Sequence, residues 1–453
     1  MMRRTAVVAA AVAVAIAAPG MANAQAPSNP SGDPSLDWLY GQNSDFAGGN
    51  GSLGSVGSSG SGFKDAFYNP PANIASLANG AIIRERVVQP IPIIGGLTKQ
   101  LAYKSTDSHG KPIVTVTTVF TPAGCNSGAG GSLGSLSAGS SGGGDCVGKG
   151  KLVSYQHATN SLGMKCQPSV IFSENNPINA LSVAVPFLQQ TLARGYTVSA
   201  PDTNGPLGSF IAGYSEGHSV LDGIRATEAH LGLSADTEVA LVGQSGGAHA
   251  TAWGAQLKDK YAPELNVISA AMAGPPLDIL ATGNANNGKN QVSYLYFAAV
   301  VGLFREFPQE AQPNGFFTAE GKEIVKKYGD ACMLGEGMNG YSGIPLQSLT
   351  NWPDQQDPIP SWPPALQVGL DNQAAKPGEI PTDIPMLIIH GNEDQIVPVG
   401  STTAMVGKYC AGGATVDYRI VPGGHVDTSI NHWPDLLDYT GDRFAHKAPG
   451  NTC

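Results

Sequence analysis

The sequence is poor in charged residues, and basic ones are the scarcer kind. Only 13% of its 453 residues are Asp, Glu, Lys or Arg, well below the usual quarter. The 25 basic residues are outnumbered by 35 acidic ones, which gives a formal net charge of −10, and no basic stripe is visible. We therefore expect no nucleic-acid partner, because binding to phosphate needs a basic surface.

Long apolar runs are missing beyond the N-terminus. The N-terminus itself carries two arginines, an apolar stretch at 5–18 that is too short for a comfortable membrane span, and the small-residue site Ala22-Asn23-Ala24. These features predict a secretory signal peptide over residues 1–24 and a mature chain that starts at Gln25. We therefore expect a secreted protein, with association to the cell envelope left open, and no transmembrane anchor after cleavage.

Metal-ligand spacing is missing as well. The chain has no C-x-x-C and no H-x-x-x-H pair, so we expect no metal site. Its six cysteines instead suggest three disulfides in an exported protein. Spacing alone does not decide among the fifteen possible connectivities. Cys125 and Cys146 bracket a Gly/Ser-rich loop and are expected to pair, and the favoured remaining pairs are Cys166 with Cys332 and Cys410 with Cys453.

Glycine is abundant, with 59 residues, and it is concentrated outside the segments that look folded. Residues 25–62 form a Gly/Ser-rich leader in which we expect little order. From about residue 63, short β-type segments alternate with helical ones. This alternation predicts an α/β fold with a mostly parallel central sheet and helices on both faces. The expected strands are 82–88, 97–104, 113–120, 152–155, 197–200, 238–242, 267–273 and 386–389, and the expected helices include 185–194 and 219–233.

Residues 275–375 interrupt this alternation. They hold an apolar, aromatic helix candidate at 292–304, a charged one at 318–328, and then a Pro- and Trp-rich tail. We interpret the segment as a helical cap inserted into the sheet domain. The insertion would divide the domain into residues 63–274 and 376–453.

One serine lies in a context typical of a nucleophile. The apolar run Val239 to Val242 leads directly into Gly243-Gln244-Ser245-Gly246-Gly247, and an Ala-rich stretch follows. Strand, sharp turn and helix in this order are what a nucleophile elbow requires. The strained turn would lift the Ser245 hydroxyl out of the sheet, at the positive end of a helix where an oxyanion is stabilised.

The Gly-x-Ser-x-Gly pattern itself is not specific here, because it occurs three more times. Two copies, at 130–134 and 139–143, lie in the Gly/Ser loop and have no strand before them and no helix after them. The copy at 213–217 is a better rival, yet a Pro/Gly/Asn loop rather than an apolar strand runs into it. Context therefore selects Ser245.

A serine nucleophile needs a base, and the base needs an acid to orient it. After the strand at 386–389 a loop presents Glu393 and Asp394, and we prefer Asp394 because it lies further out on the loop. Among nine histidines, only His425 follows a strand and a Gly-Gly turn in the right chain order. The order Ser245, Asp394, His425 is that of the α/β-hydrolases.

The other late histidines have plainer interpretations. His249 falls one helical turn after Ser245 and is expected to pack or to form a hydrogen bond. His390 ends a strand and is interpreted as structural. His432 and His446 have no suitable strand before them.

These residues predict acyl transfer from a carboxylic ester. His425 would remove the proton of Ser245, and Asp394 would fix the imidazole tautomer. Ser245 would then attack the ester carbonyl, and water would cleave the acyl-enzyme. The backbone N–H of Gly246 is one expected oxyanion donor, and the second is expected from the loop at 157–163.

Five further segments have more specific patterns. They are FYNPP at 67–71, FIAGYSEG at 210–217, LDGIRA at 221–226, GQSGGAHAT at 243–251 and YAPELN at 261–266. With them, the chain from about residue 63 to the C-terminus resembles the secretory lipase family typified by Candida antarctica lipase A, including its actinobacterial members. The likeness is weak in the cap and absent from the Gly/Ser loops.

The resemblance implies an α/β-hydrolase fold with an inserted helical cap, hydrolysis of carboxylic esters including triacylglycerols, and neither a metal nor a cofactor. It supports Ser245, Asp394 and His425 as the catalytic residues, and it assigns the rival motif at 213–217 to a non-nucleophilic loop. It also favours the disulfide between Cys166 and Cys332.

The resemblance has one departure, in the early oxyanion loop. The family carries an acidic residue there, before a Cys-x-Pro-Ser motif. Here Cys166-Gln-Pro-Ser169 is present, but the aligned position is Asn160. Asn160 would serve as well as an acidic residue if only its backbone N–H is used.

The sequence leaves several functions open. A secreted lipase or esterase acting on a lipid or ester, at an oil–water interface or in solution, is the preferred hypothesis. An acyltransferase with the same triad would differ in excluding water and binding an alcohol. A polyester hydrolase is a further alternative, and a non-catalytic lipid-binding protein is the hypothesis against which an intact triad argues most strongly.

Overall fold

The computed structural model describes residues 29, 31–40, 65–88, 97–122, 151–172 and 184–453. The signal peptide expected at 1–24, the Cys125–Cys146 pair and the serine motifs at 130–134 and 139–143 lie outside the described residues. Within the described ranges, no helix has the length and apolar character needed to cross a membrane.

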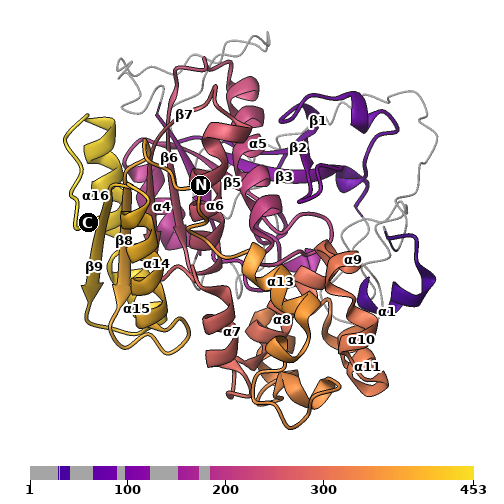
Figure 1. Ribbon diagram of the computed structural model, residues 1–453. Helices are drawn as coiled ribbons and strands as arrows, with labels where there is room; N and C mark the ends of the chain where they lie inside the picture. Colours follow the sequence, from indigo (N-terminus) through magenta and orange to yellow (C-terminus); the bar gives the residue numbers. More distant parts are fainter. Residues whose placement is uncertain (1–28, 30, 41–64, 89–96, 123–150, 173–183) are drawn as a thin grey trace, which may run out of the picture.

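Nine strands of the described chain form one sheet in the order β1-β2-β3-β5-β4-β6-β7-β8-β9 (Figure 1). The first three strands and the β3–β5 pair are antiparallel, whereas every pairing from β5 to β9 is parallel. The strands are β1 Ile82–Val87, β2 Thr98–Thr106, β3 Pro112–Phe120, β4 Lys151–Gln156, β5 Thr197–Pro201, β6 Glu238–Gln244, β7 Asn266–Ala273, β8 Met386–Gly391 and β9 Val416–Val421.

Helices cover both faces of this sheet, and the strand side chains alternate between them. Leu241 faces the layer of α5 (Gly213–Leu231), α6 (Gly246–Tyr261) and α14 (Val399–Ala411). Its neighbour Val242 faces the layer of α4 (Ala184–Ala193) and α16 (Trp433–Phe444). Both are fully buried, as expected for parallel strands covered on two sides. The predicted mostly parallel sheet with helices on both faces is confirmed.

The rival serine motif at 213–217 is not in a loop, and that expectation is wrong. α5 begins at Gly213, six residues before the predicted start, so Ser215 lies in the first turn of a helix. The segment before Gly213 is rich in Gly and Pro, so the sequence did not indicate that a helix begins there. Ser215 is buried, at 2% exposure, which is unfavourable for a nucleophile.

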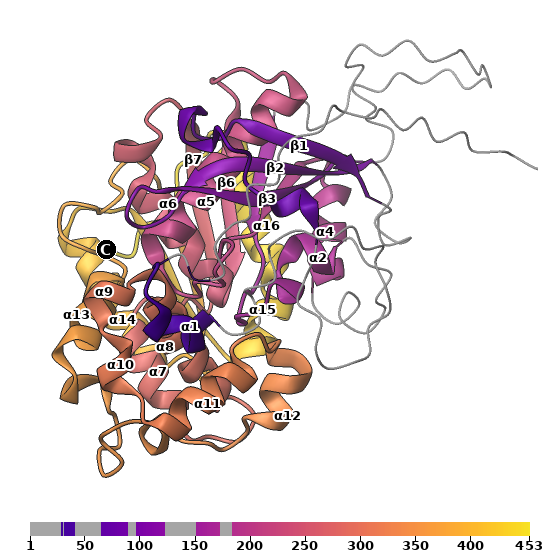
Figure 2. The ribbon, with the colours of Figure 1, turned by 90° about the vertical axis from the view of Figure 1, so that its right-hand side faces the viewer.

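Between β7 and β8 the chain forms a helical layer on one side of the sheet domain (Figure 2). Aromatic and aliphatic side chains from these helices share one hydrophobic core. The main helices are α7 Ile279–Asn286, α8 Ser293–Glu306, α9 Pro308–Ala311, α10 Pro313–Phe316, α11 Ala319–Tyr328, α12 Met338–Gly340 and α13 Pro363–Asp371.

Part of the leader also packs on this layer, so the expectation of little order is wrong for residues 31–40. Residues 34–36 form a 3-10 turn, and α1 (Asp37–Tyr40) follows. Trp38 is buried, its ring stands edge-on to Phe317 at 5.6 Å, and its Nε1 donates to Asn314 Oδ1 at 3.0 Å. Apolar residues within an otherwise Gly/Ser-rich leader account for the difference.

Two disulfides have the predicted partners. Cys166 bonds to Cys332 and thereby ties the chain after β4 to the helical layer. Cys410, near the end of α14, bonds to the C-terminal Cys453. Of the remaining helices, α2 (Pro168–Ile171) packs on β3 and β5, and α15 (His425–Asn431) begins at one of the predicted catalytic residues.

Candidate active site

The turn between β6 and α6 has the geometry of a nucleophile elbow. Ser245 stands between the strand and the helix with φ 52° and ψ −127°. A positive φ is uncommon for a residue other than glycine, and it costs about 1–3 kcal/mol where the surroundings enforce it. The strand–turn–helix prediction is therefore confirmed around Ser245, which is half-buried.

Two glycines after the serine allow a second loop to approach. A Cβ on Gly246 would lie 1.9 Å from the carbonyl oxygen of Thr159, and one on Gly247 would lie 2.1 Å from that of Gln156. Either contact is far below van der Waals distance. The small residues thus bring the loop after β4 directly beside Ser245.

Three side chains from distant parts of the chain form a continuous set of hydrogen bonds. His425 Nε2 lies 2.8 Å from Ser245 Oγ, and its Nδ1 lies 2.7 Å from Asp394 Oδ2. His425 is the first residue of α15, and Asp394 is in the loop after β8. The structure therefore brings Ser245, Asp394 and His425 together as the chain order predicted. Glu393, the alternative acid, is exposed.

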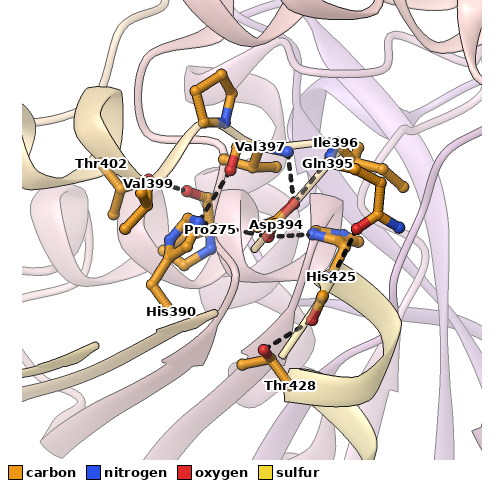
Figure 3. Close-up of polar contacts among 12 residues, drawn as sticks. Pro275, His390, Asp394, Gln395, Ile396, Val397, Val399, Thr402, His425 and Thr428 are labelled. Carbon is orange, nitrogen blue, oxygen red and sulfur yellow. Dashed lines mark hydrogen bonds and ion pairs between the residues drawn. The ribbon is translucent and has the colours of Figure 1, made fainter. Parts of the chain in front are cut away.

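The side chain of Asp394 is fully buried, and its neighbours hold it in the ionised form (Figure 3). Burial alone would raise its pKa, but hydrogen bonds from His390 and His425 and from the amide of Val397 hold the pKa well below the ordinary value. The N–H groups of Ile396 and Val397 both donate to Asp394 Oδ1, at 2.9 and 2.7 Å. An ionised Asp394 makes Nδ1 of His425 the donor and leaves Nε2 free to accept a proton from Ser245.

His390 was missed as a neighbour of the site, because a strand end suggested only a structural role. Its ring lies on the side of Asp394 opposite His425 (Figure 3). Nε2 is 3.0 Å from the carbonyl oxygen of Val397 and 3.3 Å from Asp394 Oδ2, so this nitrogen carries the proton. The sequence did contain one indication of this contact, because His390 and Asp394 are four residues apart on either side of a turn.

A second histidine–carboxylate pair is buried one helical turn after Ser245. His249 Nδ1 lies 2.7 Å from Glu216 Oε2, and both side chains are completely buried. Trp253 Nε1 donates to His249 Nε2 at 3.1 Å. The indole is only a donor, so Nε2 must accept and Nδ1 must donate to Glu216. The expectation that His249 forms hydrogen bonds is confirmed.

The two predicted oxyanion residues line the same cavity as Ser245. Gly246 is the first residue of α6, where a backbone N–H has no partner within its own helix. Asn160 lies across from it in the loop after β4, and its Oδ1 accepts from Ser161 Oγ at 2.9 Å. Burial lowers the pKa of His157, at the start of this loop, to about 4, so the loop carries no charged imidazole at neutral pH.

The cavity over Ser245 has an open volume of about 450 Å³ and a mostly apolar wall. A second, apolar pocket shares Ile279, Tyr296 and Ala299 with it and extends between the helices. The wall of the first includes Phe210, Ile211, Pro276, Leu295, Ile396 and Val397.

Among the described residues, no three His, Cys, Asp or Glu side chains cluster so that they could hold a metal ion. The expectation that neither a metal nor a cofactor takes part stays a prediction.

Known proteins with similar sequences and structures identify the family of the chain. Residues 176–452 match the sequence profile of the family described as secretory lipase. A secreted triacylglycerol lipase of Malassezia restricta is 29% identical over 402 residues, which cover 85% of this chain and 80% of that protein. A protein of Mycobacterium tuberculosis named a probable inactive lipase is 30% identical over 403 residues, with 84% and 82% covered.

Among solved structures, Candida antarctica lipase A in its closed state superimposes with a TM-score of 0.73. It is 28% identical, and 86% of this chain and 87% of that chain are covered. The predicted α/β-hydrolase fold, the expected secretion and the class of reaction are thereby confirmed. The profile match spans more than half of the sequence, so the chain belongs to the secretory lipase family and is a secreted hydrolase of lipid esters.

Proposed function

We propose that Ser245, His425 and Asp394 are the catalytic residues with which this lipase cleaves carboxylic esters, triacylglycerols included. The observation that carries the proposal is the unbroken set of hydrogen bonds from Asp394 through His425 to Ser245 at the wall of a cavity. A secreted triacylglycerol lipase among the relatives supports the substrate class.

The reaction would start from neutral His425, whose free Nε2 faces the serine. As Ser245 Oγ attacks the ester carbonyl carbon, its proton passes to Nε2, and buried Asp394 stabilises the imidazolium that forms. The imidazolium then gives this proton to the leaving alkoxide, and the alcohol departs from the acyl-enzyme. Water, deprotonated by His425, attacks the acyl carbon and releases the acid.

Charge that develops on the carbonyl oxygen would be stabilised by backbone donors. The N–H of Gly246 at the start of α6 is one, and the N–H of Asn160 is the proposed second. The close approach of the two loops at Gly246 supports this pairing. Because backbone N–H groups are the donors, the amide side chain of Asn160, engaged with Ser161, need not take part.

We further propose that residues 275–375 act as a cap over the site, inserted between core segments 63–274 and 376–453. Cap residues Ile279, Leu295 and Ala299 already form part of the wall around Ser245. The second, apolar pocket adjoins the first between cap helices and is where an acyl chain would extend. Substrate would then reach the site at an oil–water interface or as a dissolved ester.

The test is hydrolysis of nitrophenyl esters by the wild type and by Ser245→Ala, with Ser215→Ala as a matched control. We expect S245A to lose turnover and S215A to keep it. One relative is named a probable inactive lipase, so the wild type must first be shown to turn over substrate. Wild-type turnover retained in S245A would contradict the proposal.

A further inference from the structure

The helix that follows β7 presents one face to the cavity over Ser245. Ile279, Thr282, Gly283 and Asn286 of α7 follow the i, i+3, i+4, i+7 spacing of a single helical face, and all four line the cavity. Gly283 lets the ring of Tyr296 lie against the helix, since a Cβ there would come within 2.5 Å of it. Two of these four residues are polar, in a wall that is otherwise largely apolar.

Asn286 is fully buried, and its amide orientation is fixed by its partners. Nδ2 donates to the carbonyl oxygens of Thr282 and Ile396, each at 2.8 Å. Both partners are acceptors, so this end of the amide must be the NH₂ group and both of its hydrogens are used. Oδ1 is left as an acceptor, and it has no hydrogen-bond partner among the described residues.

Thr282 Oγ1 is a second buried oxygen without a partner in the described part of the chain, one turn earlier on the same face. Both residues line the cavity, and burying unpaired polar atoms is unfavourable, so a bound ligand whose group reaches and satisfies both oxygens would be stabilised. Asn286 Oδ1 can only accept, whereas Thr282 Oγ1 can donate or accept. A hydroxyl group matches the two, since it can donate to the amide oxygen and accept from the threonine.

We propose that Asn286 and Thr282 bind a free hydroxyl group of the substrate, so that the enzyme favours hydroxylated esters such as partial glycerides. The inference rests on the proposed function, because it assigns the bound group to an ester that Ser245 attacks. An ether oxygen or a second ester carbonyl would leave Asn286 Oδ1 unpaired, because neither can donate. The hydroxyl could belong to the alcohol part or to the acyl part of the ester, and the two sources have the same chemistry at these oxygens.

The experiment compares kcat/KM for three soluble esters. They are 2,3-dihydroxypropyl butyrate, with hydroxyls on the alcohol part, propyl 3-hydroxybutyrate, with one on the acyl part, and propyl butyrate, with none. For the wild type we expect one hydroxylated ester to exceed propyl butyrate by about two- to tenfold, the range for one net hydrogen bond. The ester that is favoured identifies the source of the hydroxyl.

The variants test whether Thr282 and Asn286 cause that preference. Thr282→Val keeps the shape and removes the hydroxyl, so it should lower the ratio of kcat/KM for the favoured hydroxylated ester to kcat/KM for propyl butyrate, because only the hydrogen bond to Asn286 Oδ1 remains. Thr282→Ser should retain the wild-type ratio. Asn286→Leu should have the same effect as T282V, and Asn284→Leu is its control because Asn284 is exposed on the same helix and does not line the cavity. N284L should leave the ratio unchanged.

A wild-type ratio near one for both hydroxylated esters would overturn the inference, and so would a preference that is undiminished in T282V. Asn286 also supports the loop of Asp394 through Ile396, so N286L could fail to fold, and T282V then decides alone. Failure of the proposed function would look different. It would show as turnover of propyl butyrate that survives in S245A.

Discussion

The structure holds two histidine–carboxylate pairs near Ser245, Asp394–His425 and Glu216–His249. They differ in the hydrogen-bond partner of the histidine Nε2. In both pairs Nδ1 lies 2.7 Å from a buried carboxylate oxygen, of Asp394 for His425 and of Glu216 for His249. Nε2 of His425 faces a serine hydroxyl, whereas Nε2 of His249 accepts from the indole of Trp253. Nε2 of His425 can therefore take up the proton of the serine hydroxyl, whereas Nε2 of His249 is occupied by an indole N–H that does not give up its proton.

The comparison shows that a buried histidine–carboxylate pair is not by itself a catalytic device. The pair of His249 has a structural task, since Glu216 Oε1 also accepts from the N–H of Ile211, a non-glycine residue with φ 68° that lines the cavity. It therefore supports a strained part of the cavity wall. The pair of His425 faces the hydroxyl of Ser245, and in the proposed function only there does the tautomer serve the reaction.

The largest effect is expected from the matched changes His425→Gln and His249→Gln. H425Q should lower kcat by about 10⁴-fold or more, because the serine loses its base. H249Q should keep kcat within about tenfold and lower the free energy of unfolding by about 1–3 kcal/mol, because buried polar groups lose a partner. Ester hydrolysis and chemical denaturation measure the two effects. Equal losses of activity would remove the distinction between the pairs.

The carboxylates provide a second matched pair, Asp394→Asn and Glu216→Gln. D394N should lower kcat by about 10⁴-fold at neutral pH, because the amide no longer holds His425 in the productive tautomer. E216Q should leave kcat within about tenfold and reduce stability instead. The same two assays apply, and a collapse of kcat in E216Q without unfolding would show that Glu216 acts in the chemistry.

A third carboxylate, Asp202, is also buried, but its hydrogen-bond partner is a serine instead of a histidine. It accepts from the N–H and the hydroxyl of Ser169, yet burial raises its pKa to about 7. Between about pH 4 and 7 the folded state then holds a proton that the unfolded state has lost, so this group makes the free energy of unfolding fall as pH rises, by up to about 1.4 kcal/mol per pH unit, and adds no slope above pH 7.

Asp202→Asn should remove that contribution, so its stability should fall less than that of the wild type between pH 4 and 7. Denaturant titrations at several pH values measure the slopes. Parallel slopes in the two proteins would show that Asp202 titrates normally in the fold.

The smallest effect is expected from Trp253→Phe, which removes the donor to His249 Nε2 while keeping an aromatic ring. We expect a loss of about 1 kcal/mol in the free energy of unfolding and unchanged kcat. The check is denaturation at neutral pH together with ester hydrolysis. A loss of activity as large as that of H425Q would mean that Trp253 and His249 belong to the catalytic machinery.

The proposed catalytic residues could be located from the sequence because their signals are local. Ser245 follows an apolar strand and precedes a helix, and Asp394 and His425 each follow a strand in the expected order. A hydrolase sheet brings such strand ends to one edge, so local patterns suffice to predict a distant contact.

The supporting residues were not predictable because they depend on packing between elements. Glu216 meets His249 only because α5 lies on α6, and nothing near Glu216 in the sequence indicates that neighbour. Thr282 and Asn286 could not be assigned to the site from the sequence, because only the folded structure shows that this face of α7 lines the cavity. Likewise, the order of residues 31–40 could not be predicted, because their apolar side chains pack on a surface that exists only in the folded cap.

The most direct test of the central claim, that Ser245 is activated by His425 and not by His249, is covalent labelling with a fluorophosphonate followed by peptide mass analysis. The account predicts one adduct, on Ser245, in the wild type and in H249Q, and almost none in H425Q. An adduct on Ser215, or labelling that is lost in H249Q and retained in H425Q, would contradict it.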